Sequence, residues 1–551
     1  MSGDFLLCCS VAIIRKKFGN RVYLYDVICK RVNGKPRIVS QKYLGKPEDV
    51  YGSPKLEPKA KAARIYDYGA ITALLKIAQE LKLVETIDAV VGKRRQGVSV
   101  GQYILLAALN RAVAPKSKRQ LGDWYRQTIL WRHFGFKRRQ LTSQRFWDNM
   151  GLLTQCKIDK IERRLNESLI QHWDINLAGL IYDTTNFYTF INTQTKCQLP
   201  QRGHNKQRRS DLRQVGLALL VTRDYGIPLL HRVYAGNEAD TTQFGRVVGD
   251  LTKRHRMLAQ GCEDITLVFD KGNNARKNQV VLDQTAFHFV GSLVATQHRN
   301  LLAVSRQEYR AAPLVGGKSL LAYRTQQQVM GELRTVVVTY NPKLAEAQER
   351  GIRLTVKHKT PFLNKLAEKR KVTEATMTLA VKRILVGQYL QEVVNWRVVD
   401  GRFQWWLDEE GLNRLRRERL GKKILFTDQH EWTTGEIIQA YHGQYVIEHA
   451  FRQMKDPYFI SWWPMFHWTD QKMMVHGFYC VLALLLVSLL TKRVREAGKE
   501  IGSQRLLALL DGIKEVAVIY PLGKVGAATE YVRSELFGEE AEVQELLKLG
   551  Q

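Results

Sequence analysis

The sequence is poor in cysteine and lacks the cysteine pairs that bind zinc or form redox motifs. Its 551 residues include seven cysteines, and no two of them are spaced as Cys-x-x-Cys. This spacing argues against a zinc site and a disulfide framework, and it favours a reducing compartment. The first nine residues have no basic segment ahead of their apolar residues and no convincing cleavage site, so we expect no export signal.

A long apolar segment is also missing. The longest apolar run covers residues 478–490, about 13 residues, whereas a membrane-spanning helix needs roughly 20. We interpret this run as a buried helix of the protein core, and we expect no membrane partner.

Motifs of two enzyme classes are absent or incomplete. The 13 histidines include no His-Glu-x-x-His pair. Gly317, Lys318 and Ser319 resemble the end of a phosphate-binding loop, but Ala312 stands where that motif requires its first glycine. The sequence therefore disfavours a zinc peptidase of that type and a P-loop nucleotide hydrolase.

Acidic residues are scarce relative to basic ones. The chain has 85 Lys and Arg against 53 Asp and Glu, a formal net charge of +32. So large an excess implies a polyanionic partner, and nucleic acid is the usual one. Aromatic residues make up 9% and hydrophobic residues 45% of the chain, which is typical of a folded protein rather than a disordered basic tail.

Changes of pattern divide the chain into six regions. Two alternating segments flank a turn at residues 33–36, residues 68–172 follow a helical period, and from residue 180 the order is three strands, helix, strand, helix, strand. We therefore predict an α/β protein with a β-hairpin region at 1–60, a helical DNA-binding region at 61–172, a core in two parts at 173–295 and 431–495, an insertion domain at 296–430 and a C-terminal tail at 496–551.

Basic and aromatic residues recur in the helical region between residues 116 and 139, among them Lys118, Trp124, Tyr125 and Arg126. Small helices with such residues can enter a groove of DNA or bind phosphates. The alternative is a solvated basic face on a helical bundle.

Two aspartates follow apolar strands directly. Asp183 ends the run at residues 180–182, and Asp270 ends the run at residues 265–269. An unpaired carboxylate is normally excluded from such a place. Either aspartate alone could cap a turn or a helix, but two of them on strands that can be neighbours suggest a shared site.

A third carboxylate lies on an expected helix at residues 433–457. Thr433 and Glu436 have the spacing of a capping box, and Pro457 ends the helix. Apolar residues fall on one arc of this helix, while Tyr441, Glu448 and Lys455 recur every seven residues on another face. This face is either an ordinary solvated surface or part of a site that acts on phosphate.

Three carboxylates that lie close together repel one another unless cations neutralise them. Hard divalent ions with oxygen ligands, Mg²⁺ or Mn²⁺, suit such a set. Two ions about 4 Å apart can activate a nucleophile and stabilise the leaving oxygen of a phosphodiester. Asp183, Asp270 and Glu448 are therefore candidate metal ligands.

The helix resembles a known signature. Tyr441-x2-Gln444-x3-Glu448-x6-Lys455 is similar to the Tyr-x2-Arg-x3-Glu-x6-Lys signature of bacterial and archaeal insertion-sequence transposases of the DDE class. Further segments resemble the same family: Tyr-Asp-Thr-Thr at 182–185, Gly-His-Asn-Lys at 203–206, Gly-Asn-Glu-Ala-Asp at 236–240, Phe-Asp-Lys-Gly at 269–272 and Phe-His-Trp-Thr-Asp at 466–470. The resemblance covers roughly residues 20–495.

The resemblance implies an RNase H-like mixed-sheet core with a β-rich insertion domain and a helical N-terminal DNA-binding region. It implies Asp183, Asp270 and Glu448 as catalytic metal ligands, with Mg²⁺ or Mn²⁺, two ions, as the cofactor. Tyr441 and Lys455 are expected to contact DNA phosphates, and Gln444 replaces the arginine of the signature. The expected DNA contacts also include Lys271 and the basic residues of the loop after the first strand: Arg202, Lys206, Arg208 and Arg209.

These observations lead to the hypothesis of a DNA transposase. It would bind the inverted-repeat ends of a transposon, cleave them by metal-dependent hydrolysis and join the 3′-OH to target DNA as a homodimer. We expect it in a prokaryotic cytoplasm, associated with the nucleoid. The alternatives are a non-catalytic DNA-binding protein derived from a transposase, and a metal-dependent DNA nuclease without strand transfer.

Overall fold

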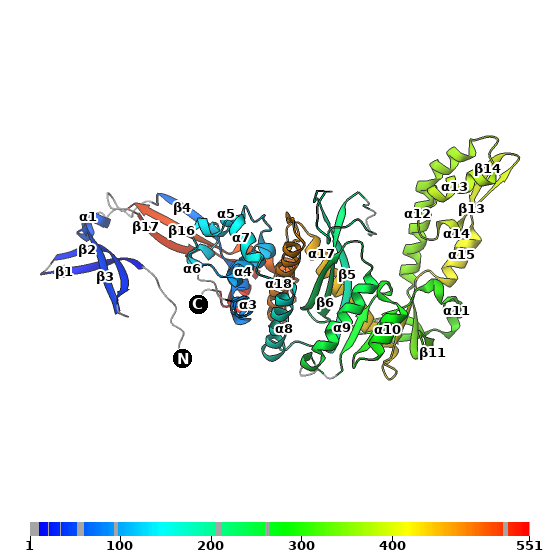
Figure 1. Ribbon diagram of the computed structural model, residues 1–551, viewed down its shortest axis with the longest axis horizontal. Helices are drawn as coiled ribbons and strands as arrows, with labels where there is room; N and C mark the ends of the chain where they lie inside the picture. Colours follow the sequence, from blue (N-terminus) through cyan, green and yellow to red (C-terminus); the bar gives the residue numbers. More distant parts are fainter. Residues whose placement is uncertain are drawn as a thin grey trace. The chain divides into compact units, whose positions relative to one another are not determined.

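The computed structural model divides the chain into two compact units. Unit 1 comprises residues 1–77, 118–145 and 490–551, and unit 2 comprises residues 78–117 and 146–489. Figure 1 shows the elements along the chain. The structure describes residues 10–19, 21–32, 35–51, 60–92, 97–192, 194–203, 209, 211–258, 262, 264–521 and 527–549.

Unit 1 begins with a three-stranded antiparallel sheet (Figure 1). The expected hairpin is present as β2 and β3, and β1 adds a strand to the other side of β2. A small core of Leu24, Leu44 and Val50 packs on one side of this sheet. The elements are β1 (Ser10–Phe18), β2 (Arg21–Val32), β3 (Lys35–Gly45) and α1 (Pro47–Tyr51).

A second sheet of unit 1 joins residues from both ends of the chain. Strand β16 pairs with both β4 and β17, and Lys514 Nζ lies 2.9 Å from Asp67 Oδ1. The segment that we expected to be a C-terminal tail therefore supplies the central strand of a sheet. The elements are β4 (Ala62–Asp67), β16 (Lys514–Pro521), β17 (Ala527–Arg533), α5 (Leu121–Arg126), α6 (Leu130–Phe134), α19 (Ser503–Gly512) and α20 (Glu539–Leu546).

Unit 2 is built on a nine-stranded mixed sheet with the order β10-β11-β12-β15-β9-β8-β5-β6-β7. Strands β5, β6 and β7 are antiparallel, whereas β8 is parallel to both β5 and β9. The predicted order of three strands, helix, strand, helix, strand is present as β5 (Gly179–Thr189), β6 (Arg213–Thr222), β7 (Pro228–Ala235), α9 (Asp240–Leu258), β8 (Thr266–Phe269), α10 (Arg276–Asp283) and β9 (His288–Ser292).

The insertion at residues 296–430 is not a separate β-rich domain, which corrects our expectation. Its strands β10, β11, β12 and β15 extend the core sheet, because β15 pairs with β9 through Leu425 and Ser292. The part that leaves the sheet is mostly helical, with one two-stranded ribbon (Figure 1). The bounds are β10 (Arg310–Pro313), β11 (Ser319–Val329), β12 (Glu332–Tyr340), α12 (Pro342–Ala367), α13 (Glu374–Ile384), α14 (Leu390–Val393), β13 (Val394–Val399), β14 (Arg402–Leu407), α15 (Glu409–Glu418) and β15 (Lys422–Thr427).

Helices complete the two units. The expected apolar core helix is α18, and it is the one helix among the described residues whose length and hydropathy would suit a membrane span. Of its 18-residue apolar window, 94% is buried in the protein, as expected for a core helix. The remaining α-helices are α2 (Gly69–Glu80), α3 (Leu83–Val91), α4 (Val100–Val113), α7 (Ser143–Met150), α8 (Gln155–His172), α11 (Arg299–Leu302), α16 (Thr434–His442), α17 (Gln444–Lys455) and α18 (Asp470–Glu496).

A buried ion cluster joins α8, β7 and α9 in unit 2. Glu162 Oε1 lies 2.5 Å from His231 Nδ1, and Glu162 Oε2 lies 3.3 Å from Arg254 Nη2. Burial raises the pKa of Glu162, but His231 and the two arginines at positions 254 and 232 outweigh this and lower it. The cluster therefore holds the helix layer on the sheet with its charges paired.

Candidate active site

The two aspartates that end apolar runs are neighbours in the sheet. Strands β5 and β8 are parallel, and Tyr182 pairs with Phe269, so Asp183 and Asp270 follow at adjacent positions. The preceding strand residues are fully buried. The two aspartates therefore stand at adjacent positions of neighbouring strands, where the strand pairing ends.

Strand β5 does not end at Asp183, in contrast to our expectation. It continues to Thr189, paired with β6, whereas its pairing with β8 ends at Tyr182. Asp183 therefore marks the end of one strand pairing and not the end of the strand. Thr185, two residues further along β5, lies on the same face as Asp183 because side chains alternate along a strand.

Two hydroxyl groups hold Asp270. The Tyr441 hydroxyl donates to Asp270 Oδ1 at 2.8 Å, and Ser292 Oγ donates to the same oxygen at 3.0 Å. Ser292 is the last residue of β9 and accepts from the Lys271 amide at 3.1 Å. Burial raises the pKa of Asp270, but these hydrogen bonds and the backbone amide of Lys271 outweigh it and bring the pKa below its usual value.

The segment at residues 433–457 consists of two helices, which corrects the expectation of one continuous helix. The capping box of Thr433 and Glu436 begins α16 as predicted, but the chain turns at Gly443 before α17 begins. A β-carbon on Gly443 would lie 3.0 Å from the Ala440 carbonyl oxygen and 3.3 Å from Ile181 Cδ1. The turn therefore lets the chain approach β5 closely.

Tyr441 and Glu448, which lie on the two helices, have different surroundings. Tyr441 is 2% exposed and points to Asp270, and burial together with that carboxylate raises the pKa of its hydroxyl. Glu448 is exposed on α17. Tyr441 therefore presents its hydroxyl to a carboxylate and not to the molecular surface.

Lys423 lies among these groups, although the sequence showed it only as one of six basic residues between 414 and 423. Its Nζ lies 4.6 Å from the centre of the Tyr441 ring. Burial of the ammonium group lowers the pKa of Lys423, and the carboxylates of Asp270 and Glu448 oppose this change. The Lys423 ammonium group therefore interacts electrostatically with both carboxylates, so Glu448 faces the same region as Asp270.

The arrangement fits a divalent ion only in part. Asp183 and Asp270 supply neighbouring carboxylate oxygens, which hard cations prefer. Within the part of the chain that the structure describes, however, no group of three or more His, Cys, Asp or Glu residues is placed to hold one metal ion. Glu448 thus lies near the pair without completing a three-carboxylate cluster.

Two further signature residues, Lys455 and Gln444, lie on α17. Lys455 Nζ donates to Thr185 Oγ1 at 2.5 Å and lies 5.6 Å from the centre of the Phe187 ring. The Gln444 amide nitrogen is buried and has no hydrogen-bond partner among the described residues. Lys455 therefore supplies a cation beside β5, whereas the Gln444 amide nitrogen is a buried donor without a partner in this part of the chain.

The remaining predicted DNA contacts differ in their surroundings. Lys271 and Arg202 are exposed. Arg209 is also exposed, but its guanidinium makes two hydrogen bonds of 2.7 and 2.8 Å with the Asp211 carboxylate. Lys206 and Arg208 lie outside the described residues.

The aromatic residues of the predicted DNA-binding helices belong to the core. Trp124 is 4% exposed and Tyr125 1% exposed, so these rings cannot contact DNA without unfolding. The basic residues Lys137, Arg138 and Arg139 are exposed. For this segment the solvated basic face describes the structure better than helices that insert aromatic side chains.

A Gly-x-Ser-x-Gly pattern stands at residues 97–101, although we expected the sequence to contain none, and it has a structural role. Ser99 caps α4: its hydroxyl accepts from the Gln102 amide at 3.2 Å, and its own amide donates to the Gln102 side chain at 2.9 Å. A hydrolase nucleophile with this pattern stands between a strand and a helix. Ser99 instead forms a capping box.

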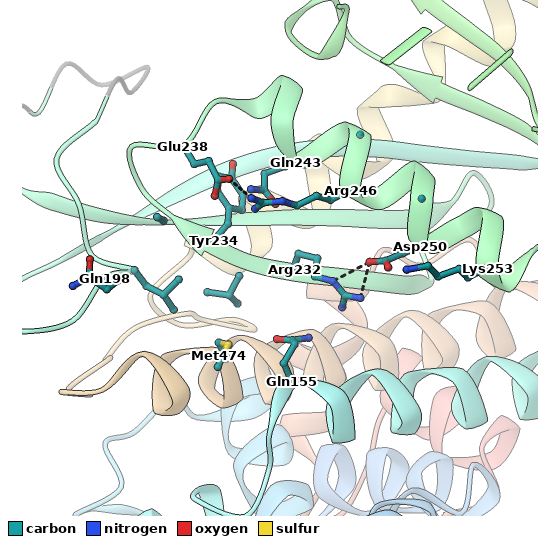
Figure 2. Close-up of a pocket in the computed structure, with 15 residues that line it drawn as sticks. Gln155, Gln198, Arg232, Tyr234, Glu238, Gln243, Arg246, Asp250, Lys253 and Met474 are labelled. Carbon is teal, nitrogen blue, oxygen red and sulfur yellow. Dashed lines mark hydrogen bonds and ion pairs between the residues drawn. The ribbon is translucent and has the colours of Figure 1, made fainter. Parts of the chain in front are cut away.

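A pocket of about 600 Å³ is lined mainly by residues of β7 and α9 and does not include Asp183, Asp270 or Glu448 (Figure 2). Four of its five charged side chains form ion pairs. Arg232 Nη2 lies 2.7 Å from Asp250 Oδ2, and Arg246 Nη2 lies 2.7 Å from Glu238 Oε1. We therefore place the candidate chemistry where the pairing of β5 with β8 ends and not in this pocket.

Comparisons with known proteins give one structural similarity and no match to a family or a curated protein. No protein-family model matches the chain, and no curated protein matches it. Among solved structures, a cryo-EM structure of the piggyBac transposase synaptic complex with hairpin DNA is similar, with a TM-score of 0.36, 10% sequence identity and 82% of each chain covered. A TM-score this low does not establish a common fold.

Proposed function

We propose that the chain is a DNA transposase of the DDE class with an RNase H-like catalytic core. The observation that carries the proposal is the placement of Asp183 and Asp270 at adjacent positions of two parallel strands, with Tyr441, Lys423 and the Glu448 helix beside them. The strand order β7-β6-β5-β8-β9, in which β8 runs parallel to both β5 and β9, supports such a core.

DNA is the proposed partner. The net charge of +32 supports it, because a phosphate backbone releases counterions when basic residues neutralise it. The chain would bind the inverted repeats of an insertion sequence, cleave the ends and join the 3′-OH to target DNA, with two copies pairing two ends. The proposed location is the prokaryotic nucleoid.

Mg²⁺ or Mn²⁺, as two ions, is the proposed cofactor, with Asp183, Asp270 and Glu448 as the residues that would hold it. When bound, such ions activate water and stabilise the leaving oxygen. The protein's own residues have other tasks. Tyr441 and Ser292 orient the Asp270 carboxylate, while Lys455 and Gln444 supply a cation and a donor for a phosphate beside Asp183.

The first test is the replacement Asp270→Ala. The substrate is DNA that carries the inverted repeats flanking the coding region, incubated with Mg²⁺. End cleavage should fall at least 10³-fold, since a metal ligand is lost, while end binding in a gel-shift assay stays within about twofold. Glu410→Ala, an exposed carboxylate on α15, is the matched control and should cleave normally. If Asp270→Ala still cleaves the ends, Asp270 is not a catalytic metal ligand.

The alternatives give different products. A non-catalytic DNA-binding protein would bind the ends and leave them intact in both the parent and the control. A nuclease without strand transfer would cut the ends but form no joined product with supercoiled target DNA. Joined products from the parent chain would support the transposase.

A further inference from the structure

The N-terminal sheet carries four aromatic rings on one face. Strand register places Lys16 opposite Tyr23, Phe18 opposite Arg21 and Tyr25 opposite Tyr43, and paired residues share a face. The rings form a continuous series: ring centres are 6.1 Å apart for Phe18 and Tyr23, 5.9 Å for Tyr23 and Tyr43, and 5.4 Å for Tyr25 and Tyr43. We call Phe18, Tyr23, Tyr25 and Tyr43 the aromatic face.

The aromatic face is open to solvent. Phe18 is 59% exposed and Tyr43 54% exposed. Lys16 lies within this face, with its Nζ 5.0 Å from the centre of the Tyr25 ring and 2.6 Å from Gln41 Oε1. Large exposed rings beside a cation are unusual on a surface that has no partner.

The small core lies on the other side of the same strands. Leu24 is 0% exposed and packs with Leu44, Val50 and Ala528. The aromatic face is therefore not needed to bury the core of this sheet, and its rings are available to a partner.

Charge decides which partner the aromatic face suits. Residues 10–46 include ten Lys and Arg but a single acid, Asp26. A second copy of this face would bring the same excess of positive charge against the first, which repulsion opposes. A polyanion is attracted instead. Rings interspersed with cations are the arrangement with which proteins bind unpaired nucleic acid, since bases stack on the rings while cations meet the phosphates.

We propose that the aromatic face binds an unpaired nucleic-acid strand by base stacking. The bases stack on Phe18 and Tyr43, the most exposed rings, and Lys16 and its basic neighbours contact the phosphates. The inference is independent of the proposed catalytic site, because all of the residues that carry it belong to unit 1 whereas the carboxylates belong to unit 2.

The test compares a ring-removing variant with its parent as full-length proteins. Phe18→Leu combined with Tyr43→Leu keeps an apolar surface but removes the stacking rings. Binding of a fluorescein-labelled 20-mer of deoxythymidine, measured by fluorescence anisotropy at 0.15 M salt, should weaken at least tenfold. Binding of a 20-base-pair duplex should change less than threefold, because no unpaired base is available to stack.

Three controls keep the outcome interpretable. Tyr43→Phe keeps the ring and should bind the single strand like the parent. Ile13→Ala, which pairs with Asp26 on the opposite face, should also bind normally. Circular dichroism confirms that each variant is folded, and both positions of the double variant are more than half exposed, so their replacement is compatible with folding.

The proposal is overturned by either of two results. Equal single-strand affinity of the double variant and the parent would show that the rings take no part. A self-association that sedimentation equilibrium detects in the parent and that the double variant loses, with DNA affinity unchanged, would identify a second copy as the partner. The Asp270→Ala variant should bind the single strand normally, so failure of the catalytic proposal leaves this test intact.

Discussion

At the scale of single residues, the structure changes the role of Tyr441. The resemblance to transposases implies a phosphate contact, but the hydroxyl donates to Asp270 and the ring lies under Lys423. A neutral donor on a carboxylate fixes its rotamer and favours its ionised form. In this position Tyr441 acts through Asp270 and is a positioning residue.

The replacement Tyr441→Phe separates the two roles. We expect end cleavage to fall about tenfold or more, because a hydrogen bond to a charged group contributes about 1.5–3 kcal/mol. The dependence of DNA affinity on salt should not change. Lys455→Ala should do the opposite and reduce the slope of log affinity against log salt by about 1. A loss of DNA affinity in Tyr441→Phe at fixed salt, as large as the loss of cleavage, would instead indicate that Tyr441 contacts a phosphate.

At the scale of elements, the break at Gly443 decides where Glu448 and Lys455 lie. Tyr441 on α16 is buried, whereas Glu448 on α17 is exposed. The close approach of Gly443 to β5 depends on its missing side chain. The distance between the start of helix α17 and β5 thus depends on one small residue, Gly443.

Gly443→Ala should impair cleavage more than stability. The new methyl group would meet the Ala440 carbonyl, Arg223 Cγ at 3.2 Å and Ile181 Cδ1, so the start of α17 must move away from β5. We expect cleavage to fall about tenfold and the melting temperature to change by no more than a few degrees. Gly351→Ala in α12 is the control: its methyl group meets nothing within 4 Å, so the helix gains up to about 1 kcal/mol and cleavage stays normal. A fully active Gly443→Ala would show that the break does not position the site.

At the scale of the whole molecule, the chain ends are part of the fold of unit 1. Strand β16 lies between β4 and β17, and Ala517 at its centre is 2% exposed. Unit 2 is built from residues that do not include these strands. Unfolding of the two units should therefore be separable.

Ala517→Asp should unfold the second sheet of unit 1 without unfolding unit 2. A carboxylate buried without a partner costs several kcal/mol. In hydrogen exchange measured by mass spectrometry, protection should be lost at residues 62–67 and 514–521 and retained in β5 and β8. Thr529→Asp, an exposed position on β17, should keep all protection. Loss of protection in both units together would mean that they unfold as one.

The sequence alone was sufficient for features that depend on local interactions. Three features are of this kind: the capping box at Thr433, the buried apolar helix and the two aspartates after apolar runs. Each depends only on residues within a few helical turns or within one strand. The order of strands and helices in the core followed from hydrophobic periodicity for the same reason.

Only the tertiary structure decided which distant residues meet. Lys423, Ser292 and Tyr441 converge on Asp270 because β9, β15 and α16 are neighbours in space, and no local pattern encodes that. The pairing of β4 with β16 joins residues about 450 positions apart and is equally invisible in periodicity. Burial, which removed Trp124 and Tyr125 from the candidate DNA contacts, is likewise a property of the packed chain.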